Sequence, residues 1–289
     1  MPHAEARFAP GLGHCWQRMA PELHIAMVEA WCRGQELPRE LQPEPEPSPA
    51  AVERIRRMVP ENWYVLNKPK IMRQVRFTLR HFRKHLVEAY GKEGGEAIAR
   101  ESLQRFEALL PDLPDIGGRE NSHARYLYLG AAGLATYRSL QARGASVEEA
   151  ARLIYLGTAS FFDSVPTRWL MRWQGRRMLG RKRCDQLRHA AAISQQRRYP
   201  DDWVFEIVEG DGRDFDFGVD YTECGVVKYL AREGAPELAP YLCWIDYPQF
   251  AAMHLRLDRT EPLAQGGQRC DFRIGRGEPV RVEPEFLHV

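Results

Sequence analysis

The stretch "WVFEIVEGDGRDFDFGVDY", residues 203–221, decides where the character of this chain changes. Residues 203–208 alternate between two sets of side chains, and residues 215–219 do the same after a Gly-Asp-Gly segment. A period of two residues is typical of β-strands, and glycines between two such runs favour a tight turn. We therefore predict a β-hairpin here.

The region before the hairpin has a helical period. Between Lys68 and Tyr90, apolar residues recur on one side at intervals of three or four, which predicts a helix. Further on, Asn121 or Ser122 is the expected N-cap of a long helix that Gly144 ends. Ser146 with Glu149 three residues later forms the pattern of a capping box at the next helix.

The region after the hairpin mixes both periods. Helices are expected at about 223–232 and 237–247, and strand-like runs follow at 253–262 and 269–276. We predict an α+β fold, with a mainly helical N-terminal two-thirds followed by a small antiparallel sheet with two inserted helices.

The segment "ELPRELQPEPEPSPAAVERI", residues 36–55, suggests a domain boundary, because proline and glutamate are typical of linkers. We predict an N-terminal helical extension with this linker over residues 1–60. Residues 61–289 then form an α+β domain that is helical over 61–200 and contains the sheet over 201–289.

Composition limits the partners and the compartment. The apolar fraction is 44%, the formal charge is +2, and no apolar run approaches the roughly 18 residues of a membrane span. The first residues lack the basic start and apolar core of a secretory signal, and six cysteines in 289 residues are too sparse for a disulfide framework. We expect a cytoplasmic protein with free thiols, a small-molecule substrate and no membrane partner.

Cys224 follows the second strand of the predicted hairpin and precedes a helix. With Asp220 or Thr222 as the cap, Cys224 lies in the first helical turn, where the helix dipole favours a thiolate and lowers the thiol pKa. The alternative is that Cys224 is a small buried apolar residue.

Cys243 and Asp246 stand three residues apart, so they share one face of a short helix. If Pro248 ends that helix, Asp246 lies near its C-terminal end, where a carboxylate is electrostatically disfavoured. Such a placement suggests a partner or a task for Asp246, although an exposed acid is the simpler interpretation.

Cys270 follows Gly266 and Gly267, which permit a tight turn or a close backbone approach to a ligand. Arg269 could bind a substrate carboxylate or remain a solvated strand residue. No closely spaced cysteine pair typical of zinc sites is present. Cys224, Cys243 and Cys270 could still bind an iron–sulfur cluster or a divalent metal, with Asp246 as a further ligand.

The order of these motifs resembles that of the L-2-amino-thiazoline-4-carboxylic acid hydrolase family. The resemblance rests on "LPDIGGRENS", "LGAAGLATYRSLQARGASVEEAARLIY", "YTECGVVKYLAREGAPELAPYLCWIDYPQF" and "LAQGGQRCDF", and it runs from about residue 70 to residue 274. The residues that occupy the family's motif positions are Cys224, Cys243, Asp246, Cys270, Gly117, Gly118 and Asn121.

The resemblance implies an enzyme that opens a small cyclic amidine bearing a carboxylate. In this hypothesis Cys224 attacks the ring carbon, Asp246 holds the amidinium and moves protons, and Cys243 and Cys270 complete the site. Arg269 or a backbone amide binds the carboxylate. Contacts with substrate are also expected from Asn121, Gly117, Gly118 and Gly267. No cofactor is required in this interpretation, whereas the metal or iron–sulfur alternative requires one.

The stretch "TRWLMRWQGRRMLGRKRCDQLRH", residues 167–189, raises a different class of function, a nucleic-acid-binding module or another non-catalytic binding module. Basic and aromatic residues at helical spacing can follow a phosphate backbone. The favoured interpretation is instead a solvated helix face whose tryptophans enter the core, so nucleic acid is not the expected partner.

Overall fold

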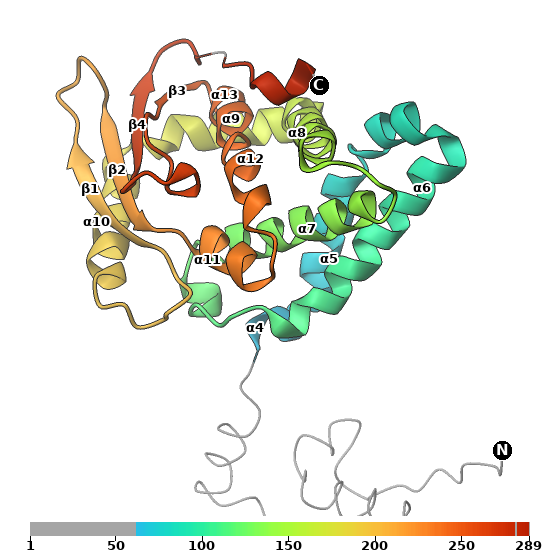
Figure 1. Cartoon of the computed structure of the whole chain (residues 1–289). Coiled ribbons are helices and arrows are strands. Elements are labelled where there is room, and N and C mark those ends of the chain that lie inside the picture. Colours follow the sequence, from blue (N-terminus) through green and yellow to red (C-terminus); the bar gives the residue numbers. More distant parts are fainter. Residues whose placement is uncertain (1–61, 281, 289) are drawn as a thin grey trace, which may run out of the picture. The chain divides into compact units, whose positions relative to one another are not determined.

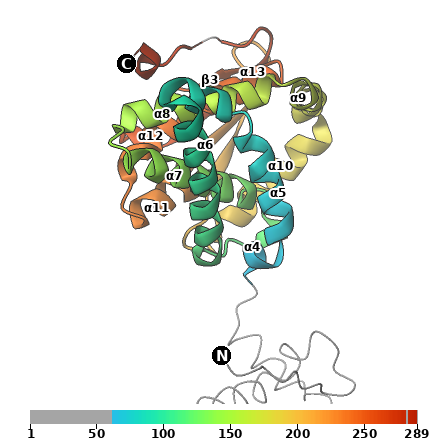
Figure 2. The same ribbon diagram turned by 90° about the vertical axis from the view of Figure 1, so that its right-hand side faces the viewer.

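Helix α7 (Ala124–Gln141) is the centre of the helical part, as its sequence "YLYLGAAGLATY" suggests. Its apolar side chains are distributed around the whole helix, and a helix of this kind is stable only when other elements cover it. In Figures 1 and 2, helices α6 and α8 pack on it, and α11 lies on another side. Most residues of α7 are buried as a result.

The computed structural model describes residues 62–280 and 282–288. The predicted extension over residues 1–60 lies outside these residues, so the proposed domain division remains a prediction. The α-helices after residue 61 are α4 (Trp63–Leu66), α5 (Lys68–Leu79), α6 (Arg83–Leu109), α7, α8 (Val147–Asp163), α9 (Val165–Met178), α10 (Arg181–Ser194), α11 (Gly225–Arg232), α12 (Ala239–Cys243) and α13 (Asp246–Ala252).

Four strands form one antiparallel sheet in the order β1-β2-β4-β3. The strands are β1 (Val204–Glu209), β2 (Phe217–Glu223), β3 (Leu255–Asp258) and β4 (Cys270–Arg276). Strands β1 and β2 are the predicted hairpin, and α11, α12 and α13 lie between β2 and β3 in the chain. The α+β prediction is confirmed, with a small antiparallel sheet after a helical region.

Short 3-10 helices lie between these elements or, in the case of η6, after the last strand. They are η2 (Leu110–Asp112), η3 (Gly118–Glu120), η4 (Pro236–Leu238), η5 (Leu263–Gln265) and η6 (Glu285–His288).

Two local predictions in the helical part are confirmed. Ser146 accepts a hydrogen bond from the amide of Glu149, whose carboxylate accepts one from the amide of Ser146, so the capping box is complete. Gly144 follows the end of α7 with a φ of 84°, a conformation that glycine adopts at little cost.

Two other predictions need correction. The N-cap of α7 is His123, one or two residues later than expected, and Asn121 instead accepts a hydrogen bond from the amide of His123. The helical period between residues 68 and 90 belongs to two helices, α5 and α6, separated at residues 80–82. Both errors concern helix ends, where a side chain that bonds locally can shift a boundary by a few residues.

The tryptophans of α9 do not enter the core, contrary to the favoured interpretation of the basic stretch. Trp169 is 78% exposed and Trp173 is 49% exposed. The buried residues of α9 are Thr167, Met171 and Gly175, so its inward face is narrow and consists mostly of small or flexible side chains.

Candidate active site

Cys224 lies at the junction of β2 and α11, as the sequence predicts, but in a different role. It is the N-cap residue of α11, with extended backbone angles, and its side chain makes no capping hydrogen bond. Asp220 and Thr222 are both within β2 and cap nothing. The Thr222 hydroxyl donates a hydrogen bond to the Val204 carbonyl instead.

Burial, rather than the helix dipole, determines the protonation of Cys224. Burial raises the pKa of the Cys224 thiol to about 11, although the nearby amides of Val227 and Val226 oppose the rise. The expected lowering of this pKa is therefore wrong, because the cost of desolvating a thiolate exceeds the benefit of the helix N-terminus. At neutral pH Cys224 is a thiol that needs a base before it can act as a nucleophile.

Cys243 and Asp246 do not share one helix. Cys243 ends α12 and Asp246 begins α13, and Pro248 lies in the first turn of α13. Proline is tolerated there because the first amides of a helix have no intrahelical acceptor. Asp246 is thus at a helix N-terminus, where the dipole favours a carboxylate, and not at the C-terminal end that we predicted.

Arg259 joins these two helices. Its Nη1 donates to Oδ2 of Asp246 at 2.8 Å, and its Nη2 donates to the carbonyl of Cys243, also at 2.8 Å. The Arg259 side chain is only 3% exposed, and its guanidinium lies over the rings of Tyr247 and Phe272 at 5.4 and 5.1 Å. A buried, doubly bonded arginine fixes both the carboxylate and the end of α12.

The Asp246–Arg259 pair sets the charge of the site. Burial raises the pKa of Asp246, and the charge and hydrogen bond of Arg259 oppose that rise. Burial is the largest single influence on Arg259 and lowers its pKa, but Asp246 together with Cys243, Tyr247 and Cys270 outweighs it, so the pKa is raised on balance. Asp246 is therefore a carboxylate that can exchange a proton nearer to neutral pH than an exposed aspartate can.

Cys270 enters the site from the sheet. Strands β2 and β4 place Tyr221 opposite Cys270, and directly opposite residues of an antiparallel pair point to the same face. The Cys270 sulfur accepts a hydrogen bond from the amide of Leu263 at 3.0 Å. Burial raises the pKa of Cys270, and the Leu263 amide and Arg259 oppose the rise.

Folding brings Cys224, Cys243, Asp246 and Cys270 together, and we name these four residues the Cys–Asp cluster. Cys270 and Asp246 both contribute through their charges to the raised pKa of Cys224. For Cys243, burial is the main cause of a raised pKa, and Asp246, Cys224 and Cys270 add to it. Groups interact in this way only at short range, so segments separated by up to 46 positions in the chain form one site.

Tyr221 and His123 extend the cluster toward α7. Burial raises the pKa of Tyr221, and the charges of Asp246, Cys224 and Cys270 add to the effect. Its hydroxyl lies 3.5 Å from Nε2 of His123, and the His123 ring stacks on Trp203 with a centroid distance of 4.9 Å. Burial, together with the charge of Arg183, lowers the pKa of His123 to about 4, so at neutral pH both groups are uncharged.

Two glycines of α7 let the other elements approach. A Cβ at Gly130 would lie 3.1 Å from a methyl group of Val226 in α11, and one at Gly133 would lie 3.3 Å from Leu242 in α12. Larger residues would push α11 and α12 away from α7. The motif "LGAAG" therefore helps to place the elements that carry Cys224 and Cys243.

Arg269 is not in the Cys–Asp cluster. It pairs with Asp220 at 3.2 Å, and Arg273 pairs with the same carboxylate at 2.6 Å. Asp220 neighbours Tyr221 in β2, so the two side chains point to opposite faces of the sheet. Arg269 thus lies across the sheet from Cys270 and already has an acidic partner.

The other predicted contact residues have local structural roles. A Cβ at Gly118 would lie 2.7 Å from Trp63, and one at Gly117 would lie 3.1 Å from Tyr199, so both glycines permit close packing. The Asn121 amide donates to the Ile116 carbonyl and to Asp202, both at 2.7 Å. Gly267 donates its amide to Pro262 in the turn before β4.

The metal alternative gains no support from the ligand geometry. Within residues 62–280 and 282–288, no group of three or more His, Cys, Asp or Glu side chains is arranged to hold a metal ion. An iron–sulfur cluster or divalent metal bound by the three thiols of the Cys–Asp cluster remains a prediction.

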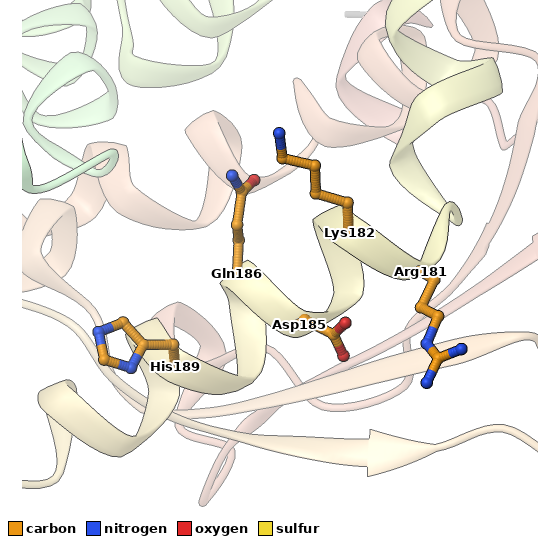
Figure 3. Close-up of a pocket in the computed structure, with 5 residues that line it drawn as sticks. All are labelled: Arg181, Lys182, Asp185, Gln186 and His189. Carbon is orange, nitrogen blue, oxygen red and sulfur yellow. The ribbon is translucent and has the colours of Figure 1, made fainter.

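A hollow with a volume of about 650 Å³ lies elsewhere on the molecule, along α10. Figure 3 shows that all the residues lining it belong to this one helix. They are Arg181, Lys182, Asp185, Gln186 and His189. None of them is a predicted site residue, and the hollow is wide open to solvent. The chemistry of the cluster, rather than the volume of this hollow, locates the candidate site.

Thiols that are partly or fully buried beside a carboxylate fixed by arginine are features of a small-molecule enzyme site. Separately, no helix among the described residues is long and apolar enough to cross a membrane. The family model for L-2-amino-thiazoline-4-carboxylic acid hydrolase matches residues 127–274, just over half of the chain. The chain belongs to this family. Comparison with curated proteins and with solved structures gave no significant match.

The matched range contains the whole Cys–Asp cluster and Arg259. It begins after Gly117, Gly118 and Asn121, which we had included in the resemblance. It also contains Tyr221, so the part of the chain that defines the family carries most of the site.

Two residues of the site, Arg259 and Tyr221, were not predicted. The sequence nevertheless contains an indication of each residue, in the alternation of side chains along the two strands. Leu255, Leu257 and Arg259 follow one period of two, as do Phe217, Val219 and Tyr221. Arg259 and Tyr221 each occupy the next inward-facing position after two buried apolar residues. A polar residue at such a position is expected to be buried and to have a functional role.

Proposed function

We propose that this protein hydrolyses a small cyclic amidine that carries a carboxylate, of the 2-amino-thiazoline-4-carboxylate type. The observation that carries the proposal is that Cys224 and Asp246 lie in one partly buried cluster in which Arg259 fixes the carboxylate. The family match supports the class of reaction, because the family is named for the hydrolysis of this compound.

The first step forms a bond from Cys224. Asp246 accepts the proton of the Cys224 thiol, and the sulfur attacks the amidine carbon of the ring. The bond between that carbon and the ring sulfur then breaks, and Asp246 returns its proton to the departing sulfur. The product of this step is an enzyme-bound isothiourea whose other end is a free thiol.

The second step consumes one water molecule. Asp246 accepts a proton from water, and the oxygen adds to the same carbon. The bond from carbon to Cys224 breaks, Asp246 returns its proton to the Cys224 sulfur, and the second water proton moves from the oxygen to a nitrogen of the former amidine. The released product is N-carbamoyl-cysteine, which is the substrate plus one water, and the enzyme is unchanged.

Three other residues have supporting roles in this proposal. Arg259 positions Asp246. Tyr221, which keeps its proton because its pKa is raised, donates a hydrogen bond to the substrate carboxylate. His123 orients Tyr221. Tyr221 replaces Arg269 as the expected carboxylate anchor, because Arg269 lies on the other face of the sheet and is paired with Asp220.

The test is a hydrolysis assay with 2-amino-thiazoline-4-carboxylate, followed by mass spectrometry for the hydrated product and by a colour reagent for the new thiol. We expect turnover by the purified full chain, a strong loss in Cys224→Ala, and no loss in the matched control Cys184→Ala. Cys184 is buried in the core and lies outside the cluster. Full activity of Cys224→Ala would rule out the covalent route.

The Tyr221→Phe variant separates binding from chemistry. The hydroxyl is proposed to bind the carboxylate, so its loss should raise KM more than it lowers kcat. An equal fall in kcat with unchanged KM would contradict the assigned role.

A further inference from the structure

Helix α9 presents an apolar surface to solvent. Val165 is 69% exposed, Trp169 is 78% exposed, Leu170 is 51% exposed and Trp173 is 49% exposed. Val165, Trp169 and Trp173 are four residues apart, so they form one stripe along the helix. Figure 2 shows α9 at the edge of the helical layer. We call these four residues, with the arginines of α9, the α9 face.

The opposite side of α9 is held firmly to the protein. Thr167, Met171 and Gly175 are buried. A Cβ at Gly175 would lie 2.0 Å from the carbonyl oxygen of Met253, so the backbones of α9 and of the segment after α13 are in close contact. Because this side is fixed, the helix cannot rotate to bury its tryptophans.

The charged side chains of α9 are all basic, and one of them, Arg168, pairs with Asp163 at the end of α8 at 3.3 Å. Between Val165 and Cys184 the sequence contains seven basic residues and no acidic one. In α9 these are Arg168, Arg172, Arg176 and Arg177. Arg177 lies over the ring of Trp173, with its guanidinium carbon 4.6 Å from the ring centroid. Arginine and aromatic groups are thus interleaved at one surface.

We propose that the α9 face binds an anionic lipid surface. Tryptophan rings favour the boundary between head groups and acyl chains, and aliphatic side chains enter the acyl region. The arginines bind lipid phosphates while their stems stay in the apolar layer. This mode needs no spanning helix, and none is found among residues 62–280 and 282–288.

Two other occupants fit less well. A second copy of the chain, related by a two-fold axis, would place arginines against arginines. A nucleic acid would match the charge and could stack on the tryptophans, but it offers no acyl layer to cover Val165 and Leu170. Only an anionic lipid surface matches both the charge and the aliphatic part of the α9 face.

The experiment uses the full chain and two kinds of vesicle, phosphatidylcholine alone and phosphatidylcholine with about one third phosphatidylserine. We expect sedimentation with the anionic vesicles only, together with a blue shift of tryptophan fluorescence. The double variant Trp169→Ala/Trp173→Ala should bind roughly tenfold more weakly or worse. The variant Arg176→Gln/Arg177→Gln should lose about fivefold for each arginine.

Matched controls lie far from α9. Val65 and Leu66 of α4 are 43% and 45% exposed, so Val65→Ala/Leu66→Ala removes exposed apolar surface, although less than the two tryptophans present. Arg100→Gln/Arg105→Gln in α6 removes the same charge. Figure 1 shows α4 and α9 at opposite ends of the described unit. Both control variants should bind vesicles like the unmodified chain.

Three outcomes would overturn the proposal. The first is no binding to anionic vesicles at low salt. The second is a tryptophan double variant that binds them as well as the unmodified chain, which would reduce the effect to bulk charge. The third is an α9 face that instead binds a single-stranded oligonucleotide, or forms a dimer seen by light scattering, with vesicle binding absent.

Discussion

The Cys–Asp cluster and the α9 face both pair arginine with aromatic rings, and the two regions differ mainly in burial. In the cluster, Arg259 is 3% exposed and lies over Tyr247 and Phe272. On α9, Arg177 lies over Trp173, which is 49% exposed. The buried arginine, Arg259, changes the pKa values of its neighbours. The exposed arginine, Arg177, adds positive charge to a surface.

The comparison teaches that residue type alone does not assign a role. Asp246 and three thiols have shifted pKa values mainly because each of them is partly or fully buried. No such burial exists on the α9 face, where salt and water weaken each charge.

The largest effect is expected for Cys224→Ala. Loss of the nucleophile should lower kcat/KM on the order of 10⁴-fold or more, whereas Trp169→Ala on the α9 face should leave hydrolysis unchanged. Steady-state assays of both variants check this. A comparable loss in the two would mean that the α9 face takes part in the reaction.

Asp246→Asn should be the next most severe. Loss of general acid–base help should lower kcat by about 10²–10⁴-fold. The change also leaves Arg259 buried beside a neutral amide, which should lower the free energy of unfolding by about 3 kcal/mol. Activity assays and urea denaturation measure the two effects, and unchanged stability would contradict the importance of the pair.

Replacing a tryptophan near the cluster and replacing one on α9 should change the stability of the protein by different amounts. Trp203 is 6% exposed and stacks on His123, so Trp203→Ala should cost about 3–5 kcal/mol. Trp169 is 78% exposed, so Trp169→Ala should change the free energy of unfolding by less than about 0.5 kcal/mol. Denaturant titrations of the pair measure the difference, and similar values would contradict the burial described here.

The last effect is a loss of stability in acid. His123 has a pKa of about 4 in the folded protein, mainly because it is buried, against about 6.5 in the unfolded chain. Between these values the unfolded chain binds the proton and the folded protein does not, so the free energy of unfolding falls as the pH falls. The loss should reach about 3 kcal/mol near and below pH 4.

The variant His123→Gln isolates this contribution, because glutamine does not titrate. Its stability should depend less steeply on pH between 6.5 and 4 than that of the unmodified chain. Identical slopes in the two proteins would show that His123 takes up its proton at an ordinary pKa.

The hairpin over residues 203–221 and the capping box at Ser146 were predictable, because both depend on neighbouring residues. That Cys224, Cys243 and Cys270 lie close together could be predicted only from the resemblance in the order of motifs to a known family. Their protonation was not predictable, since it depends on how much water the fold excludes, which a local pattern does not reveal. The exposure of Trp169 was missed for the same reason.

The turn at residues 243–246 shows another limit. Pro248 suggested a helix end, yet it lies at the start of α13. Proline is compatible with both positions, so the sequence alone could not distinguish them. The choice follows from Arg259, which binds both the Cys243 carbonyl and Asp246 and comes from a distant segment.

The close approach of Gly175 to Met253 has a mechanical consequence. Met253 follows α13, and α13 begins with Asp246, so α13 connects the contact with α9 to the carboxylate of the site. An alanine at position 175 would force the two helices apart and strain the Asp246–Arg259 bond from the far end of α13. A single methyl group on the inner side of α9 would thus disturb hydrolysis, although the tryptophans on its outer side can be removed without that cost.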